Sequence, residues 1–130
     1  MKITRFYATE DGGSRFMDIT IPIEHDRKDA EGNILKLSNG YVSPSVLFAE
    51  LPDGMVQDWH NAPARQIVVV LSGELEVETT DGQTRRWRAG EVFLADDVTG
   101  KGHKTRTLGG PARVMFAPLP KDFDISRWSP

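Results

Sequence analysis

Residues 74–88 read ELEVETTDGQTRRWR, and this stretch predicts a β-hairpin. In an extended chain, Leu75 and Val77 fall on one side, and the glutamates between and around them fall on the other. Asp81-Gly82 supplies the residue types that favour a tight turn with positive φ. Thr84 to Arg88 then returns with basic side chains. Because only one side of the first strand is apolar, the hairpin predicts a sheet that buries one face and exposes the other.

Short apolar runs like those of the hairpin recur along the chain. They predict further strands at Lys2 to Tyr7, Arg15 to Ile23, Ser45 to Glu50, Arg65 to Leu71, Glu91 to Ala95, His103 to Leu108 and Arg113 to Pro118. No stretch has a helical period of useful length, and strands do not alternate with helices. About ten short strands joined by turns predict an all-β domain, either a jelly-roll barrel or an immunoglobulin-type sandwich.

Three segments have patterns of their own. In Ser45 to Glu50 both faces are apolar, so we expect a strand that is covered on both sides. Residues 24–40 are highly charged, and we expect an irregular loop there. The C-terminal tail, residues 121–130, carries Phe123 and Trp128 and is therefore expected to pack against the domain.

Composition excludes several classes of protein. At 130 residues the chain is long enough for one domain, residues 1–130, with its own core. It has no cysteine, which excludes disulfides, thiol nucleophiles and cysteine-ligated metals. The net charge of -3 gives no basic surface for nucleic acid. No apolar run is long enough to cross a membrane, and the N-terminus does not resemble a secretory signal. We therefore expect a cytoplasmic protein that binds neither nucleic acid nor membranes.

The spacing of the glycines around His60 defines a motif in the central part of the chain. Gly54 is followed by five residues and then His60, and Gln66 is followed by six residues and then Gly73. This resembles the first motif of the cupin family, which reads Gly, five residues, His-X-His, three or four residues, Glu, six residues, Gly. In this sequence Ala62 takes the place of the second histidine, and Gln66 takes the place of the glutamate.

A second motif follows after sixteen residues. Gly90 is followed by five residues and then Asp96, and His103 comes later, after two additional residues. The family motif reads Gly, five residues, Pro-X-Gly, two residues, His, three residues, Asn. Together the motifs cover residues 54–107, and the chain resembles small single-domain bacterial cupins. This resemblance implies a double-stranded β-helix, the jelly-roll cupin barrel, which decides against the sandwich.

The resemblance also implies a candidate metal site. Cupins hold a metal inside the barrel, so His60, Gln66 and His103 are expected to meet there and to bind a divalent transition metal: Fe, Mn, Ni or Zn. Gln66 shares a strand face with core valines, where its amide needs a partner because an unsatisfied buried amide costs ~1–3 kcal/mol. Asp58 has the same strand parity as His60 and is a possible additional ligand. Asp96 and its neighbour Asp97 are further candidates near the opening of the barrel.

Two hypotheses for function follow from this site. In the first, a metal polarises a carbonyl or enolate oxygen of a small organic molecule, as in an isomerase, an oxygenase or a decarboxylase. In the second, the histidines and the glutamine form a polar cluster in a metal-free barrel that binds a small molecule as a sensor or accessory protein. The sequence leaves open whether the protein is an enzyme. The apolar N-terminal strand and the tail with Trp128 also predict a homodimer.

Overall fold

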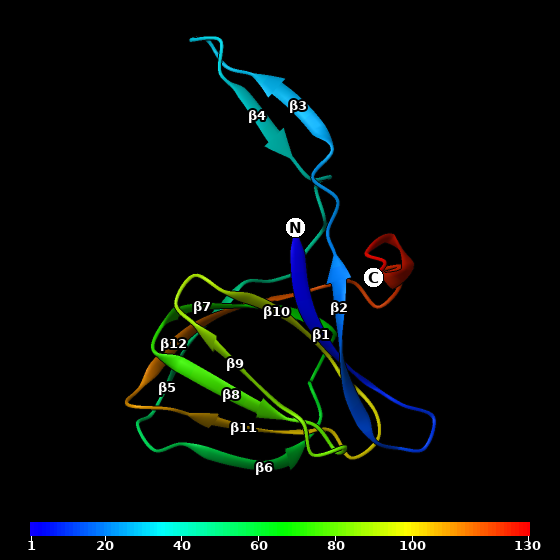
Figure 1. Ribbon diagram of the computed structural model, residues 1–130, viewed down its shortest axis with the longest axis vertical. Helices are drawn as coiled ribbons and strands as arrows, with labels where there is room; N and C mark the ends of the chain where they lie inside the picture. The colour runs from blue at the N-terminus through cyan, green and yellow to red at the C-terminus, as the bar shows by residue number, and fades with distance from the viewer.

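The computed structural model describes residues 1–130 and contains two large β-sheets that face each other (Figure 1). The six-stranded sheet contains, in spatial order, β2 (Ser14–Thr20), β1 (Lys2–Ala8), β10 (Val92–Asp96), β7 (Gln66–Ser72), β12 (Ala112–Pro118) and β5 (Leu47–Leu51). The four-stranded sheet contains β6 (Val56–His60), β11 (His103–Thr107), β8 (Glu74–Glu78) and β9 (Thr84–Arg88). This confirms the predicted all-β jelly-roll barrel. No helix has the length and apolar character that crossing a membrane requires.

The predicted hairpin of residues 74–88 is present as β8 and β9. Leu75 pairs with Trp87, and both side chains are buried between the two sheets. On the outer face, Glu76 accepts hydrogen bonds from the Nε atoms of Arg86, at 2.7 Å, and Arg106, at 2.8 Å. These two arginines cover Glu76 so well that its side chain is only 8% exposed. The core between the sheets is mainly Val, Ala and Phe.

The expectation of an irregular loop over residues 24–40 was wrong. This segment contains a two-stranded hairpin, β3 (His25–Lys28) and β4 (Ile34–Leu37), which projects from the barrel as an arm (Figure 1). Its turn is built by Asp29, whose carboxylate accepts hydrogen bonds from the backbone N–H groups of Glu31 and Asn33. The strands were missed because both are short and almost wholly exposed, and so have no buried face that would produce an alternating pattern.

The expectation that Ser45 to Glu50 is covered on both sides was also wrong for the isolated chain. β5 is the edge strand of the six-stranded sheet. Its inward face contributes Leu47 and Leu51 to the barrel cavity. Its outward face exposes 73% of Phe48, and Val46 just before it is 53% exposed.

The tail packs against the domain, as predicted. After a single 3-10 turn, η1 (Ile125–Arg127), Trp128 is 1% exposed and joins a second apolar cluster with Ile3, Ile19 and Leu94. This cluster lies on the six-stranded sheet, outside the core between the sheets. Trp128 and the N-terminal strand β1, which lies between β2 and β10, are thus used within the chain. The homodimer stays a prediction, and we expect its contact surface elsewhere on the molecule.

Candidate functional site

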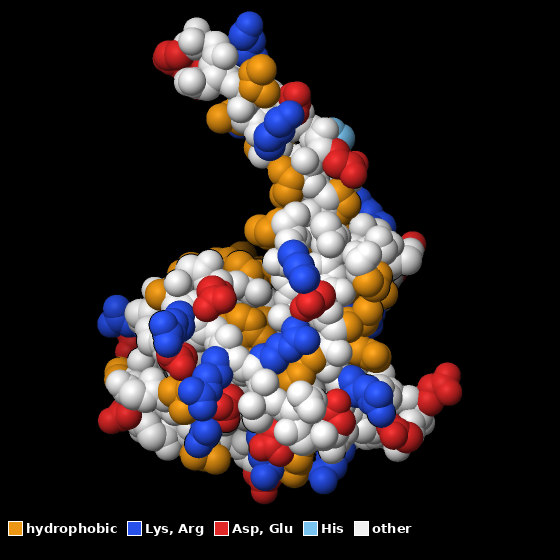
Figure 2. Space-filling view, in the orientation of Figure 1, with side chains coloured by type: hydrophobic (Ala, Val, Ile, Leu, Met, Phe, Trp, Pro, Cys, Tyr) orange, Lys and Arg blue, Asp and Glu red, His pale blue; other side chains and the backbone are white.

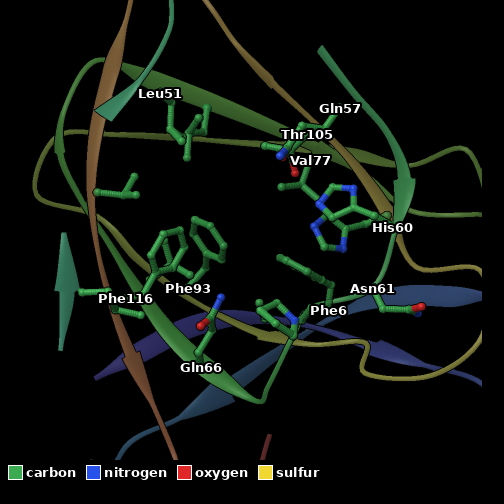
Figure 3. Close-up of a pocket in the computed structure, with 18 residues that line it drawn as sticks. Phe6, Leu51, Gln57, His60, Asn61, Gln66, Val77, Phe93, Thr105 and Phe116 are labelled. Atoms are coloured by element: carbon green, nitrogen blue, oxygen red, sulfur yellow. The ribbon is translucent and has the colours of Figure 1, made fainter. Parts of the chain in front are cut away.

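A cavity of about 330 Å³ opens between the two sheets (Figure 3). Eleven of its 18 lining residues are hydrophobic. The polar lining residues are Gln57, His60, Asn61, Gln66, His103 and Thr105. No aspartate, glutamate, lysine or arginine lines the cavity. A mostly apolar cavity with a few polar groups is the usual form of a small-molecule site.

His103 is fixed by a buried carboxylate. Its Nδ1 lies 2.5 Å from Oδ2 of Asp97, and the side chains of His103 and Asp97 are 7% and 0% exposed. Since a carboxylate accepts a hydrogen bond from the Nδ1–H group, the neutral ring keeps its lone pair on Nε2. The other carboxylate oxygen of Asp97 accepts from the backbone N–H of Ala62 at 3.3 Å. The ring of Phe6 packs against that of His103, with centroids 4.6 Å apart.

His60 reaches the cavity because β6 contains a β-bulge. His103 pairs with His60, but Thr105 pairs with Gln57, so β6 has one more residue than β11 between these two pairs. A bulge of this kind lets both Gln57 and His60 line the cavity, although they are three residues apart in the strand. Strict alternation would have placed them on opposite faces.

The bulge also sets the orientation of the His60 ring. Nδ1 of His60 donates a hydrogen bond to the backbone carbonyl of Asp58 at 2.7 Å, which again leaves the lone pair on Nε2. The two imidazoles are in contact, with ring centroids 4.3 Å apart. Behind them, Gly102 has φ +84°, and a Cβ at this position would lie 1.9 Å from the His60 carbonyl oxygen. The site therefore requires glycine there.

Asp58 does not lie on the same strand face as His60, contrary to the prediction from the sequence. The sequence placed it on the face of His60, but the bulge interrupts the alternation, and Asp58 is exposed and does not line the cavity. Its carboxylate accepts a hydrogen bond from the backbone N–H of Trp59 at 2.8 Å.

Gln66 lines the same cavity from the other sheet. It is the first residue of β7, it is 8% exposed, and it shares the inner face with Val68 and Val70, as predicted. Figure 3 shows its amide extending into the cavity from the wall away from His60. The protein provides no hydrogen-bond partner for this amide. The three residues that the sequence singled out thus share one cavity, but only His60 and His103 touch.

The donors present do not fit a resident metal held by this set of three. No group of three or more His, Asp or Glu side chains is placed to bind an ion. Only two imidazoles come together, whereas metal sites in enzymes use three protein ligands as a rule. Asp97 is engaged by His103, and Asp58 lies outside the cavity.

The role of Asp97 as the partner of His103 was missed by the sequence analysis, which considered it only as a ligand near the barrel opening. The sequence did contain a signal for this contact: Asp97 lies six residues before His103, and a glycine-containing turn lies between the two.

The neighbouring Asp96 has a different role. Its carboxylate binds Arg5 and Arg65, each at 2.7 Å, and so joins β1 and the start of β7 to β10.

Comparisons with solved structures find proteins of low similarity to this chain. An RmlC-like cupin from Shewanella frigidimarina is 23% identical over 61% of this chain and 71% of its own, with a TM-score of 0.41. A cupin 2 conserved barrel domain protein from Leptotrichia buccalis is 11% identical over 92% and 89%, with a TM-score of 0.46. A dTDP-6-deoxy-D-glucose-3,5-epimerase from Legionella pneumophila is 11% identical over 92% and 73%, with a TM-score of 0.47. Likeness at this level carries no conclusion about function.

No curated protein sequence matches the chain. The family model for the cupin domain, in contrast, matches residues 47–118. That span includes both glycine-spaced motifs, both histidines of the cavity and more than half of the chain. The protein belongs to the cupin domain family.

Proposed function

We propose that this protein binds a neutral small organic molecule in its barrel and exchanges a proton with it through His103, without a metal. One observation carries the proposal: the buried Asp97–His103 pair adjoins a cavity that no charged side chain lines. This is the metal-free alternative from the sequence, extended to include acid–base chemistry.

The lining of the cavity favours a neutral ligand. A carboxylate or phosphate that entered would lose water and would meet no arginine or lysine. Burying an unpaired charge costs far more than burying a paired or neutral group. A volume of about 330 Å³ suits a molecule of modest size with mostly apolar surface.

The geometry of His103 suits a general base. Nε2 accepts a proton from a carbon next to a ligand carbonyl, and the electrons of the C–H bond form the enolate. The imidazolium that results is stabilised by the Asp97 carboxylate at 2.5 Å. Return of the proton to the same or a different atom then restores the neutral imidazole and gives exchanged or isomerised ligand. Thr105 lines the same wall, and its hydroxyl is available to donate a hydrogen bond to the enolate oxygen.

Deuterium exchange tests the proton transfer without knowledge of the natural ligand. Acetophenone, a neutral ketone of one ring, is incubated with the protein in D₂O, and loss of its methyl proton signal is followed by NMR. We expect exchange that falls at least tenfold in His103→Gln. His25→Gln is the matched control, because His25 lies exposed on the arm and is expected to leave the rate unchanged. Equal exchange rates for wild type and His103→Gln would overturn the proposed proton transfer.

The metal content of the purified protein tests the proposal that the protein functions without a metal. Protein purified without a chelating tag is expected to contain far less than one Fe, Mn, Ni or Zn per chain by elemental analysis, before and after incubation with these ions. The double variant His60→Ala/His103→Ala is the control for adventitious metal. One metal per chain that is lost in this variant would contradict metal-free function and favour the metal-assisted hypothesis.

A further inference from the structure

We infer that the ligand carries a hydrogen-bonding group at each of two opposite ends, and that Gln66 recognises the end remote from the histidines. The inference rests on the proposed function, because it specifies the class of molecule that the cavity binds. Gln66 supplies the polar group of the six-stranded sheet that enters the cavity.

The Gln66 amide makes no hydrogen bond within the protein and is open to the cavity, although the residue as a whole is only 8% exposed. Its neighbours in the sheet register, Ala95 on β10 and Pro118 on β12, have side chains without hydrogen-bonding groups. An amide that faces a mostly apolar cavity favours a ligand that offers it hydrogen bonds. Because glutamine has both a donor and an acceptor, its natural complement is another amide or a carbonyl group.

Apolar side chains surround this end of the cavity. Figure 3 shows Phe93 and Phe116 beside the Gln66 amide, with Phe6 lying towards the histidines. Aromatic walls of this kind pack well against a flat ring. The part of the ligand between its two polar ends is therefore apolar, and a single ring is the simplest structure that fits.

The opposite end of the ligand meets the wall that contains His60 and His103. Nε2 of His103 is an acceptor, so it is complemented by a hydroxyl group or another neutral donor. Packed sheets lie roughly 10 Å apart, which leaves room for one ring with a substituent at each end. The structure thus points to a neutral para-disubstituted ring with an amide or carbonyl group at the Gln66 end. At the histidine end it carries the group that gives up its proton to His103, and a hydroxyl takes the place of that group in the binding test.

Three compounds test this assignment by isothermal titration calorimetry or ligand-observed NMR. 4-Hydroxybenzamide has both groups, phenol has only the donor, and benzamide has only the amide. We expect 4-hydroxybenzamide to bind the wild type at least tenfold more tightly than phenol. In Gln66→Met, which keeps the side-chain length and removes the amide, this ratio should fall below threefold while the affinity for phenol is unchanged. Gln83→Met, at an exposed glutamine of the β8–β9 turn, is the matched control and should keep the tenfold ratio.

The outcomes separate this inference from the proposed function. If phenol binds but 4-hydroxybenzamide has no advantage, or keeps its advantage in Gln66→Met, the role of Gln66 is wrong and the binding barrel stands. If none of the three compounds binds although acetophenone exchange depends on His103, the inferred ligand class is wrong and the proposed function stands. If that exchange is absent as well, both fail.

Discussion

The carboxylate of Asp97 lies 2.5 Å from Nδ1 of His103, and it holds the ring against a cavity wall that has no charge of its own. A hydrogen bond to an ionised acceptor is roughly twice as strong as one to a neutral acceptor. The pair therefore fixes both the orientation of the imidazole and the nitrogen that carries its proton.

This relationship predicts the tautomer of His103. In the neutral ring the proton is expected on Nδ1, and ¹⁵N NMR of labelled protein distinguishes the two tautomers. Asp97→Asn weakens the hydrogen bond, and we expect it to raise the population with the proton on Nε2. His60 is an internal control, because its Nδ1 donates to the backbone carbonyl of Asp58 and should keep its tautomer in the variant. A wild-type His103 protonated on Nε2 would contradict the assigned role of Asp97.

Gly102 is predicted to be essential for the geometry of the site. In Gly102→Ala the new Cβ would meet the His60 carbonyl oxygen at 1.9 Å, so the β6 backbone must move. We expect a loss of stability of about 2–4 kcal/mol by chemical denaturation, together with altered NMR signals from His60. Gly54→Ala is the matched control, since Gly54 also has a positive φ, +69°, but nothing lies within 4 Å of the added atom. It should cost only about 1–2 kcal/mol. Equal losses for the two variants would show that the contact with His60 is unimportant.

Glu76 is predicted to contribute to stability in a pH-dependent way. Hydrogen bonding to Arg106, reinforced by Arg86, lowers the pKa of the Glu76 carboxyl below its ordinary value of 4.5, although burial acts in the opposite direction. A lowered native pKa means that this stabilisation is complete above the unfolded pKa and is lost as the pH falls through the native pKa. Glu76→Gln should therefore destabilise the protein by about 1.5–3 kcal/mol at pH 7, and by progressively less below pH 4.5.

Urea denaturation at pH 7 and at pH 3 measures this change. Glu78→Gln on the same strand is the control, because Glu78 lies opposite Thr84 and acts on Arg106 only at longer range, and it should have a smaller effect at either pH. A destabilisation by Glu76→Gln that is the same at both pH values would contradict the electrostatic explanation.

The alternation of apolar and polar residues was sufficient to predict the barrel and part of the site. Strand periodicity placed Leu75 and Val77 in the core correctly, and it put Gln66 on the inner face with Val68. Local pattern succeeds here because the side chains of a regular strand alternate between its two faces. Glycine spacing then indicated the family, and with it the two histidines that touch.

The same reasoning failed where the structure departs from regular alternation or depends on distant residues. The bulge in β6 moves Asp58 away from the face of His60, and no local signal in residues 56–60 marks the extra residue. The contact between Asp97 and His103 depends on the path of a turn, which strand parity does not describe. The arm of β3 and β4 was missed because it has no buried face to produce a pattern.

The exposed apolar side chains lead to a last prediction, which concerns assembly. We expect a homodimer, as the sequence suggested, but formed through surfaces other than β1 and Trp128. Phe48 on the free edge strand β5 is 73% exposed and pairs in register with Met115 on the adjacent β12. The arm exposes 61% of Ile34, and Figure 2 shows apolar side chains along its length. An isolated two-stranded hairpin has marginal stability in water, so contact with a second copy would stabilise the arm.

Light scattering coupled to gel filtration measures the mass in solution, and we expect twice the mass of the chain for the wild type. Phe48→Ser should shift the mass towards that of a monomer, with an unchanged circular dichroism spectrum, because Phe48 is little used within its own chain. Val98→Ser is the matched control. Val98 is 46% exposed on a loop that belongs to neither surface, and its substitution should leave the dimer intact. A wild-type monomer at every concentration would reject the dimer, and a dimer unaffected by Phe48→Ser would place the contact elsewhere on the molecule.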